Sequence, residues 1–322
     1  MWRIGLLGAS RIAPPAVIVQ AKTNPDFEVT AVGARDLGRA RTYAETHDIL
    51  HAVGSYEALI ARDDIDVIYN ALPPSMHLEW TLRALEAGKA VLCEKPFCMT
   101  ATEARAMADA AAKARRPLLE AFHYRFHRVI RDAEALVRSG ALGKLTRAEA
   151  EFRATIARTP DELRWRAELG GGGLMDLGTY PLHALRTLVG AEPRIASATA
   201  TFDDGVDTDL SAELVFPGDV PARIACTMTA ERFSAGLTLE GERGRLEIVN
   251  FIAPHMGCRF TATIDGVTTA RPTDGPSTYA AQLAHMAEVL RGQTPPLTGG
   301  KDAVAQMTAI DAIYAAAGRP AF

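Results

Sequence analysis

A lysine in the first half of the chain stands where parallel sheets bind their ligands. The apolar run Val91-Leu92-Cys93 ends in Glu94-Lys95-Pro96. A residue at the C-terminal end of a parallel strand points toward the edge of the sheet where α/β proteins form their sites. A lysine partly removed from water there is suited to general acid–base chemistry. We therefore predict a proton-transfer role for Lys95; an ordinary surface lysine is the alternative.

Three polar side chains follow a run of three glycines in the second half of the chain. Asp176, Tyr180 and His183 are spaced at i, i+4 and i+7, so a helix would place them on one face. The glycines would let the start of that helix approach a ligand. Pro181 disturbs a helix that starts at Asp176, so the first regular turn is predicted nearer Gly178. The alternatives are an N-cap role for Asp176 and a half-buried core position for Tyr180.

A dinucleotide-binding turn is predicted near the N-terminus. The run Gly8-Ala9-Ser10-Arg11-Ile12-Ala13 follows an apolar strand. It approximates G-x-G-x-x-G/A, in which small residues form a tight turn and let a pyrophosphate approach the backbone. Gly8 and Ala13 fit, whereas Ser10 replaces the middle glycine with a hydroxyl that could reach a phosphate oxygen. A strand–turn–helix that binds nothing would match this degenerate pattern as well.

The end of the second predicted strand bears on the choice of cofactor. It reads Val32-Gly33-Ala34-Arg35-Asp36, with no acid at the strand tip itself. Arg35 is suited to stacking on adenine and to pairing with a 2′-phosphate, and Asp36 could still serve the ribose. We therefore predict NADP(H) in preference to NAD(H). A solvated surface arginine is the alternative for Arg35.

Other arrangements in the sequence carry weaker signals. His123 and His127 have the helical spacing of zinc ligands, but Tyr124 replaces the glutamate of H-E-x-x-H, so we expect two ordinary histidines and no metal. Arg164-Trp165 could line a substrate pocket, or could be a packed tryptophan beside a surface arginine. No G-x-S-x-G motif or Cys/His arrangement indicates covalent hydrolysis.

Several separated blocks resemble the glucose–fructose oxidoreductase, inositol dehydrogenase and rhizopine-catabolism (Gfo/Idh/MocA) family in order and spacing, over nearly the whole chain. They are residues 4–13, 69–77, 94–96, 120–127 and 171–180. The chain is most similar to the dimeric dihydrodiol dehydrogenase and aldose (xylose-type) dehydrogenase branch. That branch has a similar E-A-F-x-Y-R-F block and a tyrosine at the position of Tyr180. Ser10, His123 and Arg128 depart from its pattern.

The resemblance implies that Lys95 and Tyr180 transfer the proton of the substrate oxygen, with Asp176 in support. It implies cofactor contacts from Gly8, Ser10, Arg11, Ile12, Arg35, Leu72, Pro73, His77, Glu94 and Lys95. The implied substrate contacts are His123, Arg164, Trp165 and His183.

The expected activity is hydride transfer between a nicotinamide and a hydroxyl or keto carbon of a sugar, polyol or cyclic diol. Two alternatives stay open. One is a biosynthetic reductase of a ketosugar-nucleotide, which would need a basic pocket for the diphosphate. The other is a non-catalytic nicotinamide-binding sensor. The family also implies a homodimer or higher homo-oligomer, formed through an open sheet face.

The elements that would position these residues show two different patterns of predicted secondary structure along the chain. Short apolar runs alternate with helical patterns at 3–7, 28–32, 67–71, 90–93 and 117–122, which predicts a doubly wound parallel sheet. A helix at 129–137 then leads into long alternating segments at 145–156, 194–202, 208–216, 222–230, 236–248 and 258–270. We therefore expect a Rossmann domain at 1–122 and, at 123–322, an α+β substrate-binding and dimerisation domain with a large, mostly antiparallel sheet.

Composition excludes several classes of protein. Of 322 residues, 48% are hydrophobic and 23% charged, as in a soluble globular protein. The net charge of -4 comes from 39 acids and 35 bases with no basic run, which argues against nucleic acid or a membrane surface as partner. Four cysteines without a C-x-x-C pair indicate reduced thiols. The chain enters a strand at once with no signal-peptide pattern, so we expect a cytoplasmic protein.

Overall fold

A computed structural model describes residues 1–319. The chain folds into two units, neither of which is a single stretch of sequence. The first combines residues 1–122 with 279–304, and the second combines residues 123–278 with 305–319. The expected division at residue 122 did not anticipate that the segment 279–304 joins the first unit.

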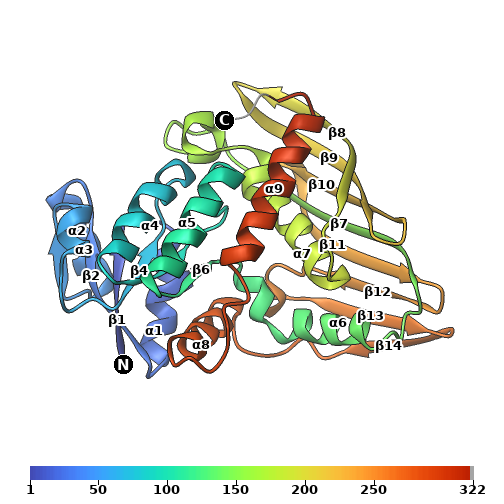
Figure 1. Cartoon of the computed structure of the whole chain (residues 1–322), viewed down its shortest axis with the longest axis horizontal. Helices are drawn as coiled ribbons and strands as arrows, with labels where there is room; N and C mark the ends of the chain where they lie inside the picture. Colours follow the sequence, from blue (N-terminus) through green and yellow to red (C-terminus); the bar gives the residue numbers. More distant parts are fainter. Residues whose placement is uncertain (320–322) are drawn as a thin grey trace. The chain divides into compact units, whose positions relative to one another are not determined.

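The first unit is built on a six-stranded sheet in the order β3-β2-β1-β4-β5-β6; β2, β1, β4 and β6 are labelled in Figure 1. Every neighbouring pair of strands is parallel, which confirms the predicted α/β class. The strand bounds are β1 Trp2–Leu7, β2 Phe27–Gly33, β3 His51–Val53, β4 Val67–Asn70, β5 Ala90–Cys93 and β6 Leu118–Glu120. The sequence pattern did not indicate β3, because three residues are too few to show an apolar period.

The helices of this unit begin where the sequence supplies a capping side chain. Asp36, Ser55 and Thr100 each accept a main-chain N–H three residues ahead. Glu103 completes the box at Thr100 by accepting the N–H of Met99 (2.9 Å). The helices are η1 Pro14–Ile18, α1 Val19–Thr23, α2 Leu37–His47, α3 Tyr56–Ile60, η2 Pro74–Met76, α4 His77–Glu86, α5 Ala101–Ala114 and α8 Thr278–Leu290.

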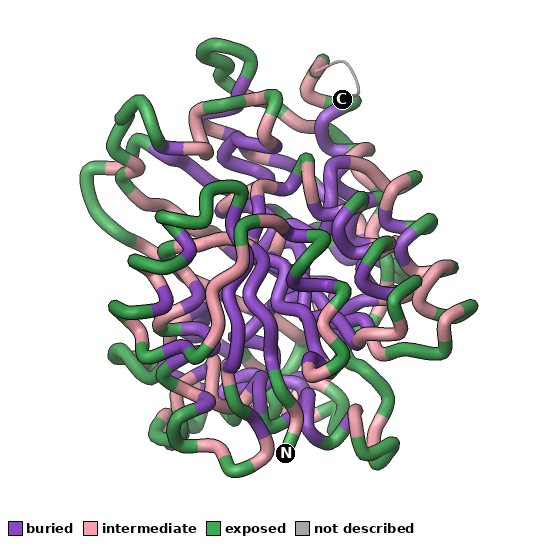
Figure 2. The backbone as a smooth tube through the Cα atoms, turned by 90° about the vertical axis from the view of Figure 1, so that its left-hand side faces the viewer, coloured by how far each residue is buried: buried purple, intermediate pink, exposed green. Residues whose placement is uncertain are grey.

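The core of the first unit explains why a late segment belongs to it. Apolar side chains of β1, such as Ile4 and Leu6, share a buried cluster with Leu283 and Met286 of α8. Figure 2 shows long buried segments running through the interior, with exposed residues gathered on the outer turns and loops. Burial of this kind stabilises by about 25 cal/mol per Å² of apolar surface, so α8 is held by the core of the first unit.

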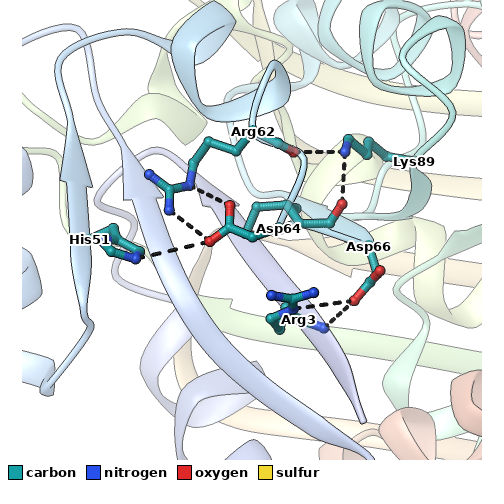
Figure 3. Close-up of polar contacts among 7 residues, drawn as sticks. Arg3, His51, Arg62, Asp64, Asp66 and Lys89 are labelled. Atoms are coloured by element: carbon teal, nitrogen blue, oxygen red, sulfur yellow. Dashed lines mark hydrogen bonds and ion pairs between the residues drawn. The ribbon is translucent and has the colours of Figure 1, made fainter.

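A polar cluster fixes the amino-terminal edge of the parallel sheet (Figure 3). Lys89 donates to two carbonyl oxygens of the loop before β4, one of them that of Arg62 (2.8 Å). Asp64 accepts two hydrogen bonds from the Arg62 guanidinium, and Asp66 accepts the N–H of Arg3 (2.8 Å). These residues precede β1, β4 and β5 or start them. The cluster therefore holds the edge opposite the one at which Lys95 stands.

The second unit contains an eight-stranded sheet in the order β14-β13-β12-β11-β7-β10-β9-β8. Its pairs are antiparallel except for β10 with β7, which confirms the predicted, mostly antiparallel sheet. The bounds are β7 Leu145–Thr155, β8 Arg194–Asp203, β9 Val206–Phe216, β10 Val220–Thr227, β11 Thr229–Gly241, β12 Gly244–Val249, β13 Arg259–Ile264 and β14 Val267–Arg271.

Two of the predicted segments are hairpins rather than single strands. The segment 236–248 spans the end of β11 and most of β12, joined through Glu242 and Arg243. The segment 258–270 spans β13 and most of β14, with Asp265-Gly266 as the turn. Across the turn between β11 and β12 the buried positions change from odd numbers (Leu237, Leu239) to even numbers (Leu246, Ile248), because the paired residues on either side of a two-residue turn face the same side of the sheet. Reading each segment as one alternating run overlooked this shift of one residue.

One face of the large sheet is covered by helices. Inward residues of β7, such as Ala148 and Ala150, are buried, whereas Arg147, Glu149 and Glu151 lie on the other face. Figure 1 shows α6 (Arg128–Arg138) and α7 (Thr179–Val189) along the covered face. No helix within residues 1–319 is long and apolar enough to cross a membrane.

Candidate active site

The segment that carries Asp176 and Tyr180 begins with an irregular turn. Residues Leu174–Gly178 form one π-helical turn (η6) that continues directly into α7 at Thr179. Pro181 is therefore the third residue of α7, and because it has no N–H it cannot donate a helical hydrogen bond back into η6. This confirms that the first regular turn begins next to Gly178. π-Turns of this kind are frequent at functional sites.

The glycine run is required by packing inside the protein. A Cβ at Gly171 would lie 2.5 Å from the carbonyl oxygen of Arg164. Gly172 has φ +126, and a Cβ there would lie 2.3 Å from Asp207 Oδ1. Both approaches exclude any side chain. The glycines therefore let η6 approach other parts of its own unit, whereas we had expected them to admit a ligand.

Asp207 holds the start of this turn. It is fully buried, and its Oδ2 accepts the N–H of Leu174 (2.6 Å) while its Oδ1 accepts the hydroxyl of Tyr314 (2.8 Å). The capping that Asp176 might have supplied thus comes from a residue on β9 that the sequence pattern did not indicate. Burial raises the pKa of Asp207 to about 6, although the two hydrogen bonds favour the carboxylate.

This raised pKa predicts a dependence of stability on pH. Because the folded state favours the protonated carboxyl, the contribution of Asp207 is fully present below about pH 4 and is lost as pH rises through about 6. An increase from 3.8 to about 6 corresponds to about 3 kcal/mol. We expect the unfolding free energy of the wild type, relative to Asp207→Asn, to fall by about that amount between pH 4 and pH 7.5.

Urea unfolding at both pH values measures this difference. Asp161→Asn, at an exposed carboxylate, is the matched control and should show no such change. A difference between wild type and Asp207→Asn that stays constant with pH would contradict the role of burial.

Asp176 forms an ion pair instead of a cap. Its Oδ2 lies 2.8 Å from Nε of Arg164, which also approaches Glu162 (3.4 Å). Burial acts to lower the pKa of the Arg164 guanidinium, but the carboxylates of Asp176 and Glu162 outweigh it and raise that pKa. Asp176 is therefore presented together with a fixed cation. Such a pair can bind and orient a hydroxyl-rich molecule.

The Tyr180 hydroxyl lies in a short polar chain. It is 3.3 Å from Nε2 of His123, and Nδ1 of the same ring is 2.8 Å from the hydroxyl of Thr278. Tyr180 and His123 are both buried. Tyr180 is thus more deeply buried than the half-buried core position considered for it, and its hydroxyl contacts a titratable group.

Aromatic rings surround Tyr180 on the helix-covered side of the sheet. Phe152 of β7 meets it edge-to-face at 5.8 Å between ring centroids, and Phe233 meets Phe152 at 5.7 Å. Phe233 is 60% exposed and Phe152 is partly exposed. An apolar wall beside a phenol is suited to the carbon face of a ring-shaped substrate.

Two predicted substrate residues are used inside the protein. His183 is fully buried, and its Nδ1 is hydrogen-bonded to the Tyr124 hydroxyl (2.6 Å). Trp165 donates its Nε1–H to the carbonyl of Ile156 (3.2 Å), and the guanidinium of Arg158 covers its ring. His183 and Trp165 therefore have structural contacts, whereas His123 and Arg164 lie with Tyr180 and Asp176.

The predicted dinucleotide turn is formed as expected in the first unit. Gly8 has φ +87, and its N–H donates to the carbonyl of Gly33 (2.8 Å). A Cβ at Gly8 would lie 3.0 Å from Leu72, so only glycine suits this position. The Ser10 hydroxyl accepts the N–H of Ala13 (3.3 Å), and Arg11 is exposed. The turn is thus held by hydrogen bonds within the first unit.

Two exposed arginines follow β2, Arg35 in the loop and Arg39 in the first turn of α2. Arg35 is hydrogen-bonded to Tyr56, and Arg39 donates to the carbonyl of Ala9 in the dinucleotide turn (3.2 Å). Burial raises the pKa of Tyr56, and the arginine charges lower it in part. Asp36 caps α2 by accepting the N–H of Arg39 (2.6 Å), so one of its oxygens is already used. Sequence analysis identified Arg35 and missed Arg39.

Lys95 is presented by a well-ordered strand end. The Glu94 N–H donates to the carbonyl of Asn70 (2.9 Å), which extends the pairing of β5 with β4. The Glu94 carboxylate accepts the Tyr69 hydroxyl (2.6 Å) and the N–H of Lys95 (3.2 Å). Glu94 is thereby held against the sheet, while the Lys95 side chain is partly exposed.

His77 braces the two loops that flank this edge. Its ring is fully buried, with Nε2 2.8 Å from the carbonyl of Leu72 and Nδ1 3.0 Å from that of Pro96. Burial lowers the pKa of His77 to about 4, so the neutral ring donates one N–H at neutral pH. The ring thus braces the loops after β4 and β5, and the cofactor contact expected of His77 stays a prediction. Leu72 is buried beside Gly8, and Pro73 is partly exposed.

Comparison with known proteins identifies the family. Residues 2–122 match the family described as "Oxidoreductase family, NAD-binding Rossmann fold", and residues 130–247 match "GFO/IDH/MocA C-terminal domain". The chain belongs to the Gfo/Idh/MocA oxidoreductase family.

Several members of this family are similar over most of the chain. D-xylose 1-dehydrogenase (NADP(+)) 2 of Haloferax volcanii is 32% identical over 97% of this chain and 96% of its own length. dTDP-3,4-didehydro-2,6-dideoxy-alpha-D-glucose 3-reductase of Streptomyces violaceoruber is 36% identical over 90% and 85%. The crystal structure of aldose-aldose oxidoreductase from Caulobacter crescentus complexed with glycerol has a TM-score of 0.90 at 29% identity, covering 98% of this chain and 97% of that one.

Membership in the Gfo/Idh/MocA family confirms the resemblance that the sequence blocks indicated. The protein is an enzyme, an oxidoreductase with an NAD(P)-binding Rossmann domain. This removes the non-catalytic sensor from the alternatives. Within residues 1–319, no group of three or more His, Cys, Asp or Glu side chains is arranged to hold a metal ion.

Proposed function

We propose that this enzyme is an NADP(H)-preferring dehydrogenase that acts on a CH–OH group of a sugar, polyol or cyclic diol. The observation that carries the proposal is the group around Tyr180. A buried phenol, the Arg164–Asp176 ion pair and the partly exposed ring of Phe152 stand together in one unit. Polar groups for hydroxyls beside an apolar wall suit a carbohydrate-like ring. The similarity to a D-xylose dehydrogenase supports the same class of substrate.

The residues of the first unit fit a dinucleotide. The positive φ of Gly8 and its closeness to Leu72 leave room for a backbone approach at this turn and no room for a side chain. Arg35 and Arg39 supply positive charge at the end of β2. We propose that Gly8, Ser10 and Arg11 lie at the pyrophosphate and the two arginines at the 2′-phosphate. When bound, the nicotinamide would accept or donate the hydride.

Replacing Arg35 tests the preference for NADP(H). We expect Arg35→Ala to weaken NADP(H) binding by roughly 1–3 kcal/mol, the usual loss for one charge-assisted phosphate contact, with little change for NAD(H). Dissociation constants for both cofactors, measured by fluorescence titration, decide the matter. Arg83→Ala, at an exposed arginine on α4, is the matched control. An equal loss for both cofactors, or none, would count against this role of Arg35.

The family resemblance assigns the proton chemistry to Lys95 and Tyr180. We propose that Lys95 and Tyr180 exchange the proton of the substrate hydroxyl. Asp176, held by Arg164, orients the substrate instead of touching the reacting oxygen. A panel of aldoses, polyols and cyclic diols with NADP⁺, followed at the absorbance of NADPH, tests the proposal. Absence of turnover with every member would overturn it.

A second candidate is a reductase of a nucleotide-linked ketosugar. It is favoured by the 36% identity to a dTDP-ketosugar 3-reductase. Such a substrate brings a diphosphate, which needs fixed positive charge. NADPH oxidation in the presence of a dTDP-linked ketosugar, set against the same free sugar, separates the two candidates.

We also propose a homodimer in the cytoplasm. The outer face of the large sheet carries both cations and anions along β7, at Arg147, Glu149, Glu151 and Arg153, and a face of mixed charge can pair with its own copy around a twofold axis. All four cysteines are free thiols, as is usual in a reducing compartment. Light scattering of the purified protein measures the oligomeric state.

A further inference from the structure

His123 connects the Tyr180 hydroxyl to a second, buried hydroxyl. Its Nε2 faces Tyr180 at 3.3 Å and its Nδ1 faces Thr278 at 2.8 Å. The His123 ring also packs edge-to-face on the Tyr180 ring, at 5.9 Å between centroids. The imidazole is buried and lies at the first position of the short helix His123–Phe126 (η3). The His123 ring is therefore held by a polar contact at each nitrogen and by its packing against the Tyr180 ring.

An isolated phenol is poorly matched to proton transfer at neutral pH. Its ordinary pKa is about 10, whereas that of an imidazole is about 6.5. Acid–base groups work best when their pKa lies near the working pH. A histidine in contact with a catalytic tyrosine thus supplies an acid–base group whose ordinary pKa lies near neutral pH. Which nitrogen exchanges the proton is set by the hydrogen bond that the other one makes, and here the shorter contact is that of Nδ1 with Thr278.

We propose that His123 is the proton acceptor and donor behind Tyr180 and acts on the substrate through it. In the direction of oxidation, the substrate hydroxyl proton moves to the Tyr180 oxygen. The phenolic O–H bond breaks and an N–H bond forms at Nε2 of His123, which becomes an imidazolium with its Nδ1–H donated to Thr278. Reduction reverses both transfers. The inference rests on the proposed role of Tyr180, and it replaces the substrate contact that we had expected of His123.

The neighbouring phenol and histidines have partners of their own, so the contact between His123 and Tyr180 is distinct from theirs. The adjacent phenol, Tyr124, is hydrogen-bonded to His183 (2.6 Å). His127, the other histidine of the same sequence block, uses Nδ1 to accept the N–H of Val129 at the start of α6 (3.3 Å). His127 is equally buried and lies only four residues away. It is therefore a matched control for histidine substitution in this segment.

A double-mutant cycle tests the coupling. We expect His123→Phe to lower kcat about 10–100-fold with little change in the KM for NADP⁺. In the Tyr180→Phe background, the same change should cost no more than about twofold, because the two residues act in one step. His123→Gln keeps hydrogen-bonding groups but cannot take up a proton, so it should lose kcat to the same extent as His123→Phe. His127→Gln should keep kcat, and circular-dichroism melts show that each variant is folded.

A measurement without cofactor or turnover completes the test. Nitrogen-15 NMR of histidine-labelled protein reports which ring nitrogen carries the proton. The His123 signals, assigned by their loss in His123→Gln, should show protonated Nδ1 and should shift in Tyr180→Phe, while those of His127 stay unchanged.

The outcomes separate the two proposals. Multiplicative losses in the double variant, full activity of His123→Gln, or His123 signals indifferent to Tyr180→Phe would overturn the relay and leave the proposed function standing. Unchanged kcat in Tyr180→Phe would instead overturn the role of Tyr180 itself.

Discussion

Replacement of Lys95 by alanine is expected to lower kcat by about 10²–10⁴-fold, the usual range for loss of a general acid–base group. The affinity for NADP(H) should change little. Glu94, held by Asn70 and Tyr69, fixes the strand end whether or not the lysine side chain is present. The loss is therefore expected in turnover and not in assembly of the site. Steady-state kinetics with a separate titration of cofactor binding measures both quantities.

Two further variants show what the lysine contributes. Lys95→Arg keeps the charge but cannot release a proton at any working pH, so it should be as inactive as Lys95→Ala if proton transfer is the role. Lys113→Ala, at an exposed lysine of α5, should match the wild type. Collapse of cofactor binding in Lys95→Ala, with turnover per bound complex preserved, would make Lys95 a structural residue.

The fold could be predicted wherever the apolar pattern within one segment was enough to identify it as a strand or a helix. β1, β2, β4, β5 and β6 are short apolar runs because a parallel strand is covered on both faces. The same logic fails at β3, which has three residues, and at the turn between β11 and β12, where the alternation shifts by only one residue. It also fails for α8, whose place is set by packing against side chains such as Ile4 and Leu6, almost three hundred positions earlier.

The candidate site divides in the same way. The spacing within one segment was enough to identify Asp176 and Tyr180 as candidate site residues. No local pattern could show that Asp207 would accept the N–H of Leu174, or that Arg39 would reach the carbonyl of Ala9, because these contacts join residues about thirty positions apart. The role of a lysine or histidine in a family block also cannot be assigned until its burial is known. His77 is an example, because it is fully buried and braces loops of its own unit.

Loss of the Tyr180 hydroxyl is expected to lower kcat roughly 10–1000-fold, within or below the acid–base range. Tyr180→Phe should keep the fold, because the ring contacts with Phe152, Tyr124 and His123 involve carbon atoms that phenylalanine retains. Cofactor binding should also be kept. Asp176→Asn should behave differently: it weakens the ion pair with Arg164 (2.8 Å), so it should cost less in kcat and more in the KM for substrate.

Tyr124→Phe separates proton transfer from the general cost of deleting a buried hydroxyl. Its hydroxyl makes a shorter hydrogen bond, 2.6 Å to His183, than the 3.3 Å contact of Tyr180 with His123. Deleting it should therefore destabilise the protein by about 1–3 kcal/mol while leaving kcat near the wild-type value. In thermal melts Tyr124→Phe should therefore be the less stable variant, whereas in steady-state kinetics Tyr180→Phe should have the lower kcat. If Tyr180→Phe kept full kcat, the proton would have to pass through Lys95 with water, and Tyr180 would be a packing residue.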